Sequence, residues 1–137
     1  MEPLRTLARW GLAAFMGFAG VGHFRSTEVF LGQTPSFLPF RTAIVLVSGV
    51  VEIAFALALV VLPGQRRLVG RLLALFYVVI FPGNLYQAIA GTSSFGLDTP
   101  GKRIARLFFQ PVLVALALWV TGGPRYDAPA EAGEAAR

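Results

Sequence analysis

The feature that most constrains this chain is the apolar run from Thr42 to Leu62, TAIVLVSGVVEIAFALALVVL, which carries a single carboxylate, Glu52, near its middle. A helix of this length spans about 31 Å at 1.5 Å per residue, which matches the hydrocarbon thickness of a bilayer. A charged group at that depth costs roughly 2.5–3.5 kcal/mol even on insertion scales, so it normally faces inward toward polar partners. The run therefore predicts a membrane-spanning helix whose acid has partners elsewhere in the chain.

The composition agrees with a protein that resides in a lipid bilayer. Of the 137 residues 55% are hydrophobic and 14% charged, and the mean hydropathy is +0.67. The net charge of +5 does not indicate nucleic-acid binding, because the basic side chains form small groups that flank apolar runs, as membrane anchors do. The chain has no cysteine, so it has no thiol chemistry of its own, and a redox role would need a bound cofactor or a partner protein.

Four apolar segments predict the architecture, at about residues 4–22, 42–62, 68–89 and 104–120. Short links between them predict an all-α, antiparallel four-helix transmembrane bundle in a domain of residues 1–122, with both termini on one side. Residues 123–137, rich in Ala, Gly, Pro and Glu, are expected to be a disordered tail. Arg5 and Arg9 before a short apolar run also resemble a secretory signal, which we consider the less favoured alternative.

The connection from His23 to Arg41 has its own character and is expected to be an interfacial segment on the membrane surface. Ser26 or Thr27 could cap a short helix that runs through Leu31. Residues that prevent a longer helix follow: Gly32, Pro35 and Pro39. Five bulky apolar side chains make a free loop improbable: Phe24, Phe30, Phe37, Leu38 and Phe40. An ordinary interfacial segment and a lid folded over the helix ends both remain open.

Two further signals concern helix packing. Ala13, Gly17 and Gly20 lie three or four residues apart on one helical face, where small side chains let another helix approach closely. Pro82 lies inside the third segment, deletes one backbone hydrogen bond and crowds the carbonyl of Val78. Nearby polar side chains are expected to satisfy the freed groups, and the local candidates are Asn84 and Gln87.

Counting depth along each segment places the polar side chains together. His23 ends the first helix on the side away from the termini, and Glu52 lies about 15 Å below that surface at 1.5 Å per residue. The same half of the bundle receives seven candidate ligand-binding residues: His23, Ser48, Glu52, Asn84, Gln87, Arg106 and Gln110. Glu52 could be neutral when alone or stay charged beside Arg106 or His23. Each residue also has a plain structural interpretation, as an interfacial ring, a snorkelling cation or a bridge between helices.

These residues occur in a pattern that resembles a known family. FAGVGHF from residue 18, SGVVEI from residue 48, FPGN from residue 81 and RLFFQ from residue 106 are similar to segments of the DoxX-like family of small membrane proteins, as are Pro35 and Leu38-Pro39. The resemblance covers about residues 10–120 and implies a four-helix membrane bundle. It implies a role near quinone-linked thiosulfate oxidation, membrane redox complexes or their assembly, and it favours His23, Glu52, Asn84 and Gln110 as the shared site.

The function is expected to be that of a redox-associated membrane subunit whose polar pocket binds a quinone-like or other small ligand. The alternative is a non-catalytic assembly subunit that contacts a membrane or redox partner protein through the small-residue face and the aromatic connection. A transporter is less favoured because no inverted repeat is visible. One histidine alone cannot form a histidine-based metal site, and no phosphate-binding loop occurs, so whether the protein is an enzyme stays open.

The location is expected to be the inner membrane of a bacterial cell. A small excess of arginine on the side of the termini favours cytoplasmic termini. The sequence leaves the oligomeric state open, including a homo-oligomer.

Overall fold

The computed structural model describes residues 2–91 and 96–122, and it is helical throughout this part of the chain, with no strand. The elements follow in this order: α1 (Glu2–Arg25), α2 (Thr27–Leu31), α3 (Arg41–Val61), the short 3-10 helix η1 (Pro63–Gln65), α4 (Arg66–Ala90) and α5 (Pro100–Val120). The all-α prediction is therefore confirmed for the described residues. The predicted disordered tail, residues 123–137, lies outside them.

Three helical stretches among the described residues are long and apolar enough to cross a membrane: Arg41–Val61, Pro63–Ala90 and Pro100–Val120. Helix α1 has 24 residues but is not one of them, because Arg5 and Arg9 interrupt its first half. The structure thus supports three of the four predicted spans by length and composition, and supports the first as a helix.

One helix start and one helix cap differ from the prediction. Helix α5 begins at Pro100 rather than near residue 104, because Thr99 caps it by accepting a hydrogen bond from the Lys102 backbone N–H at 3.2 Å. The predicted short helix α2 is present, but no side chain caps it. The hydroxyl of Thr27 instead donates to the carbonyl oxygen of His23 at 2.8 Å, one turn back.

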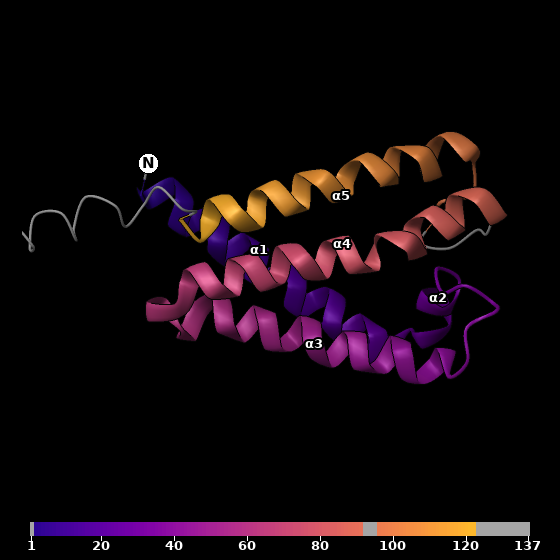
Figure 1. Cartoon of the computed structure of the whole chain (residues 1–137), viewed down its shortest axis with the longest axis horizontal. Helices are drawn as coiled ribbons and strands as arrows, with labels where there is room; N and C mark the ends of the chain where they lie inside the picture. The colour runs from indigo at the N-terminus through magenta and orange to yellow at the C-terminus, as the bar shows by residue number, and fades with distance from the viewer. Residues whose placement is uncertain (1, 92–95, 123–137) are drawn as a thin grey trace, which may run out of the picture.

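The long helices lie side by side and form two closely packed pairs, α1 with α3 and α4 with α5 (Figure 1). Contacts between the pairs, α3 with α4 and α1 with α5, are fewer. The beginning of α1, the end of α5 and the turn from α3 to α4 all lie at one end of the molecule in Figure 1. Helix α2 and the start of α3 lie at the other end.

Small residues allow α1 and α3 to approach. A Cβ atom added to Gly20 would lie 2.9 Å from the carbonyl oxygen of Gly49, and one added to Gly49 would lie 2.9 Å from that of Gly20. Gly17 faces Ala56 at an ordinary contact distance of 3.8 Å, and Ala13 is buried. The predicted small-residue face therefore does receive a helix, but that helix belongs to the same chain, so the face is not free for a partner protein.

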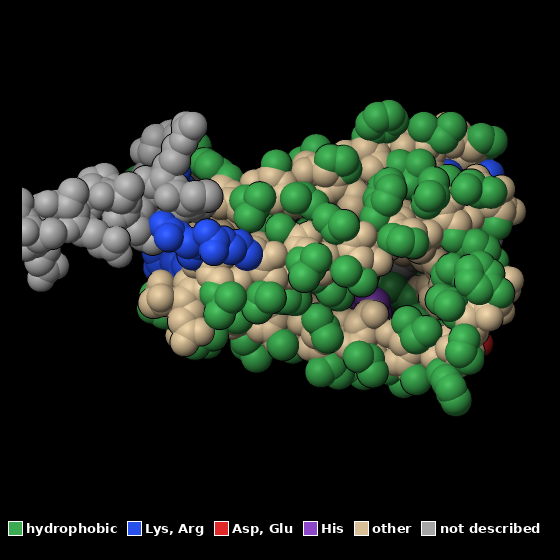
Figure 2. Space-filling model, in the orientation of Figure 1, with side chains coloured by type: hydrophobic (Ala, Val, Ile, Leu, Met, Phe, Trp, Pro, Cys, Tyr) green, Lys and Arg blue, Asp and Glu red, His purple; other side chains and the backbone are tan. Residues whose placement is uncertain are grey.

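The outer surface is apolar. Large hydrophobic side chains cover the view in Figure 2, and Phe18, Val79 and Phe108 are each more than 60% exposed. Arginine and lysine side chains gather near the two ends of the view. A soluble protein would not leave apolar patches of this extent in water, whereas lipid tails cover them without cost.

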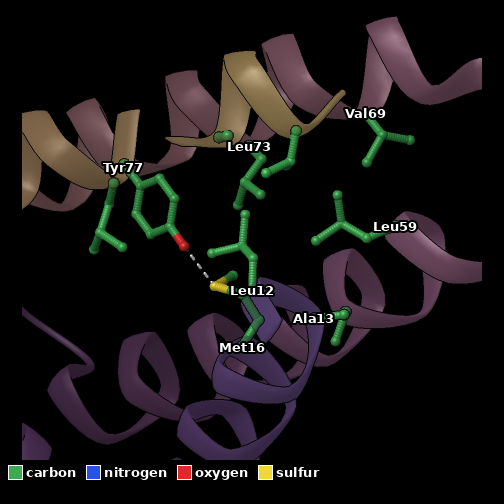
Figure 3. Packing of buried hydrophobic residues seen from close by; sticks show 11 residues of the cluster. Leu12, Ala13, Met16, Leu59, Val69, Leu73 and Tyr77 are labelled. Carbon is green, nitrogen blue, oxygen red and sulfur yellow. Dashed lines mark hydrogen bonds between the residues drawn. The ribbon is translucent and has the colours of Figure 1, made fainter. Parts of the chain in front are cut away.

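The hydrophobic core lies toward the end that holds the start of α1 and the end of α5. We call this region the apolar half and define it by eleven residues: Leu12, Ala13, Met16, Ala56, Leu59, Val69, Leu73, Tyr77, Leu113, Ala117 and Val120. Figure 3 shows these side chains meeting between the helices, with the Tyr77 hydroxyl donating to the Met16 sulfur at 2.8 Å. The buried polar side chains beyond Tyr77 line the remaining part, which leaves room for a site there.

Candidate functional site

The centre of the site is a buried pair formed by His23 of α1 and Glu52 of α3. Their atoms Nε2 and Oε2 are 3.1 Å apart, and both side chains are about nine-tenths buried. The close approach of Gly20 and Gly49 makes this pairing possible, because it brings the backbone of α1 within reach of the middle of α3. The lone acid of the apolar run therefore has its partner on the neighbouring helix.

The second ring nitrogen defines the tautomer. Nδ1 of His23 lies 2.7 Å from the carbonyl oxygen of Val45, and since a carbonyl only accepts hydrogen bonds, Nδ1 must carry a proton. Nε2 is then the ring nitrogen that faces the carboxylate of Glu52.

One oxygen atom of the pair still lacks a hydrogen bond. The Nε2 and Oε2 atoms are at ion-pair distance, but their alignment is not that of a hydrogen bond, and Oε2 of Glu52 is buried with no hydrogen-bond partner in the described structure. A buried oxygen without a partner is costly unless a ligand or water completes it. The ring of Phe30 covers one face of the imidazole, with centroids 3.8 Å apart.

A chain of amide side chains forms the second part of the site. Gln33 donates from Nε2 to Asn84 Oδ1 at 3.2 Å and to Gln87 Oε1 at 2.9 Å. Asn84 donates in turn from Nδ2 to Gln110 Oε1 at 3.3 Å, and Arg106 Nη1 donates to the same oxygen at 3.2 Å. Asn84, Gln87 and Gln110 are buried, so this network links α4, α5 and the connection before α3.

The amide chain ends at the proline in α4. Gln110 donates from Nε2 to the carbonyl oxygen of Tyr77 at 2.7 Å, one residue before Val78, whose donor Pro82 removes. The carbonyl that Pro82 frees is that of Val78, so this bond supports the adjacent backbone, and the expectation that a neighbour satisfies the freed group stays a prediction. Asn84 and Gln87, the local candidates, accept hydrogen bonds from Gln33.

The predicted site residues thus fall into a pair and a network. Arg106 makes no ion pair with Glu52 among the described residues: it bonds to Gln110 and lies 5.3 Å from the Phe109 ring centre. Ser48 is half-buried and joins neither group through a hydrogen bond in the part of the chain that the structure describes.

Sequence reasoning missed two contributors, Gln33 and Phe30. Both lie on the connection of residues 26–40, which we call the strap. A polar Gln among aromatic and proline residues was the available signal, but its partners on α4 lie more than fifty residues away in the sequence.

The strap is folded onto the helix ends rather than lying free. Arg41 stabilises this fold of the strap by donating two hydrogen bonds from Nη2, to Leu31 O at 2.7 Å and to Thr34 O at 2.9 Å. Phe40, the last strap residue, has φ = +55°, a backbone conformation that favours glycine. Such strain persists only where surrounding contacts hold the segment in place. Of the two interpretations left open for this segment, the contacts favour a cover over the helix ends.

The site offers hydrogen-bonding groups: amides, a guanidinium, an imidazole and a carboxylate. No group of three or more His, Cys, Asp or Glu side chains able to hold a metal occurs among residues 2–91 and 96–122. The unpartnered oxygen of Glu52 is the atom that a small polar molecule could complete.

These features define a class: a helical multi-pass membrane protein with a polar site buried on one side of an apolar core. A family model described as "Domain of unknown function (DUF8561)" matches residues 12–121, and the chain belongs to this family. The matched range includes the apolar half, the strap and every residue of the pair and the network. No curated protein and no solved structure matches the chain.

Proposed function

We propose that this protein is a redox-associated membrane subunit whose polar site binds a small ligand with a quinone-like headgroup. In this proposal α1, α3, α4 and α5 form an antiparallel transmembrane bundle in the inner membrane of a bacterial cell, with both termini in the cytoplasm. The single observation that carries the proposal is Glu52, a buried acid at the middle of an apolar helix, whose Oε2 lacks a hydrogen-bond partner beside His23.

The apolar exterior and the alternating positions of the helix connections support the bundle. Two groups of basic residues support its orientation. The end with the start of α1 carries Arg5, Arg9, Arg66, Arg67 and Arg71, and the opposite end carries Arg25, Arg41, Lys102 and Arg103, apart from Arg106, which is partly buried and bonds to Gln110. The small excess at the first end favours the cytoplasmic side for the termini.

The chemistry of the site supports a quinone-like headgroup. A quinone presents two carbonyl acceptors, and its reduced form presents two hydroxyl donors. The site has an amide donor on Asn84, a guanidinium donor on Arg106, and a carboxylate acceptor on Glu52. Resemblance to the DoxX-like family points to the same class of ligand.

The test is equilibrium binding of a short-tailed benzoquinone to the purified protein in lipid nanodiscs. Glu52→Gln and His23→Gln each replace one member of the pair by an amide while keeping a similar side-chain size. We expect the Kd to rise roughly tenfold to a hundredfold, because a hydrogen bond to a charged group contributes about 1.5–3 kcal/mol. Glu28→Gln, an exposed carboxylate on α2, is the matched control and should leave the Kd unchanged. Absence of binding to the unaltered protein, or equal Kd values for Glu52→Gln and Glu28→Gln, contradicts the proposal.

A non-catalytic assembly role is the second candidate, favoured by the exposed aromatic side chains of the strap. Phe37 and Phe40 are 78% and 82% exposed, and they could contact a membrane protein partner. A stoichiometric partner that copurifies with Glu52→Gln but not with Phe37→Ser and Phe40→Ser would favour this role over ligand binding.

A further inference from the structure

We infer that the ligand enters the site sideways from the lipid, through a gap between α3 and α4, and not from the water at the end covered by the strap. This inference rests on the proposed function, since it concerns how a ligand reaches that same site. It also defines the ligand class further, as a molecule dissolved in the bilayer with a polar head and an apolar tail.

The route from water is blocked by the strap. Arg41 donates to two carbonyl oxygens in the middle of the strap, Gln33 bonds the strap to α4 twice, and Phe30 covers the imidazole of His23. A ligand entering from this end would have to break several of these contacts together. Each is a buried or half-buried hydrogen bond or ring contact, and the losses would add to the barrier.

The route from the lipid is open. Figure 2 shows a hollow between α4 and α3 beside α2, and the imidazole, the only one in the chain, is visible inside it. The rings of Phe55 and Phe76, 5.7 Å apart, mark where α3 and α4 touch. Toward the strap the two helices separate in Figure 1.

Helical spacing identifies the rim of this gap. One and two turns from Phe55 toward the strap are Val51 and Ser48, and one turn from Phe76 is Ile80. One turn further, Gly83 lies against the backbone of Gln33, so the strap closes the gap at that point. All four are partly buried, between the exposed outer face and the core. Ser48 bonds to neither part of the site, and it is the polar side chain on this otherwise apolar rim.

The surroundings of the hollow determine what can pass. Apolar side chains frame it in Figure 2, so a tail can stay in lipid while the head moves between the helices toward Glu52. The head must be small and uncharged during passage, because a charge in this environment is costly. A water-soluble anion or cation would not take this route.

The test separates a gate from a binding contact. Ile80→Trp places a large ring at the rim, and Val79→Trp, on the exposed lipid side of the same helix, is the matched control. We expect Ile80→Trp to lower the association and dissociation rate constants of a short-tailed benzoquinone about tenfold, an added barrier of about 1.4 kcal/mol, with Kd within about twofold. Val79→Trp should change neither rate. Stopped-flow mixing of nanodiscs with ligand-loaded vesicles measures both rates.

Two more variants are needed. One repeats the block at a second position in case Ile80→Trp misfolds, and the other tests entry from the water. Ser48→Trp narrows the gap from the α3 side and should also slow both rates, so the inference does not depend on one substitution. Arg41→Gln loosens the strap and should leave the association rate unchanged. If Arg41→Gln raises that rate while the two rim variants match Val79→Trp, entry is from the water and the inference is wrong. Failure of the proposed function gives a different result, which is no binding to the unaltered protein.

Discussion

The two halves of this molecule bury opposite kinds of side chain, apolar in one and polar in the other. In the apolar half the side chains of Leu73, Ala117 and Val120 are fully buried within a cluster of apolar side chains that also contains Tyr77. The rest of the buried interior is the polar half, which we define by His23, Glu52, Asn84, Gln87 and Gln110. These side chains are buried to a similar degree, and Oε2 of Glu52 has no hydrogen-bond partner in the described structure. The stability of the apolar half depends on how well its side-chain volumes fill the space between the helices. The buried polar groups of the other half lower the stability unless each has a hydrogen-bond partner.

The difference indicates where stability and function are located. Dispersion and close packing hold transmembrane helices together when lipid offers no hydrophobic driving force between them. The apolar half can therefore anchor the helices while the polar half keeps an incompletely satisfied site, as functional sites commonly do. Substitutions that separate the two halves test this division.

The largest effect is expected for Leu73→Ala in the apolar half. Leu73 has no exposed surface, so truncation leaves a cavity among α1, α3 and α5 and should lower the free energy of unfolding by about 2–5 kcal/mol. The adjacent Leu72→Ala is the control, because Leu72 is about half exposed toward lipid. Thermal unfolding in detergent, followed by size-exclusion chromatography, measures both. Equal midpoints for the two variants would mean that this half does not anchor the helices.

A smaller but still clear loss is expected for Gly49→Ala beside the polar half. The added Cβ would lie 2.6 Å from the Cβ of His23 and 2.9 Å from a backbone oxygen, so α1 and α3 must separate, at about 1–3 kcal/mol. Separation also pulls His23 from Glu52, so the variant should lose quinone binding together with stability. Gly17→Ala is the matched control on the same interface, since its Cβ would meet Ala56 at 3.8 Å. If both variants behave alike, close approach near the pair is not what builds the site.

The two halves also differ in how far the sequence predicts them. Hydropathy alone predicted α3, α4 and α5, and the three-to-four spacing of Ala13, Gly17 and Gly20 predicted a close helix contact. Both depend on a local pattern that each helix carries in its own residues. The apolar half follows from such patterns, because they identify the residues of each helix that face inward.

The polar half was predicted only as a group. Counting depth placed His23, Glu52 and Arg106 in one half of the bundle, but depth does not say which residues face each other. The pairing of His23 with Glu52, and of Arg106 with Gln110 instead of Glu52, depends on helix rotation and on the Gly20–Gly49 contact. Gln33 was missed because a loop residue has no periodicity from which its direction can be predicted.

The smallest effect is expected at the exposed ion pair of Asp98 and Lys102, which sharpens the contrast with the buried pair. The two groups are 2.8 Å apart but each side chain is more than half exposed, and such pairs contribute little because solvent screens them. Asp98→Asn should therefore leave the unfolding midpoint at pH 7 unchanged, as should Lys102→Gln.

Its pH dependence has a defined sign. The hydrogen bond from Lys102 holds the pKa of the Asp98 carboxyl below its ordinary value, so its small stabilisation is present above about pH 4 and is lost as the pH falls through the lower folded-state pKa. Any difference between Asp98→Asn and the unaltered protein should thus disappear in acid, and none should arise between pH 5 and 7. A loss at pH 7 as large as that of Gly49→Ala would show that surface charge, and not the buried contacts of the two halves, determines the stability of this fold.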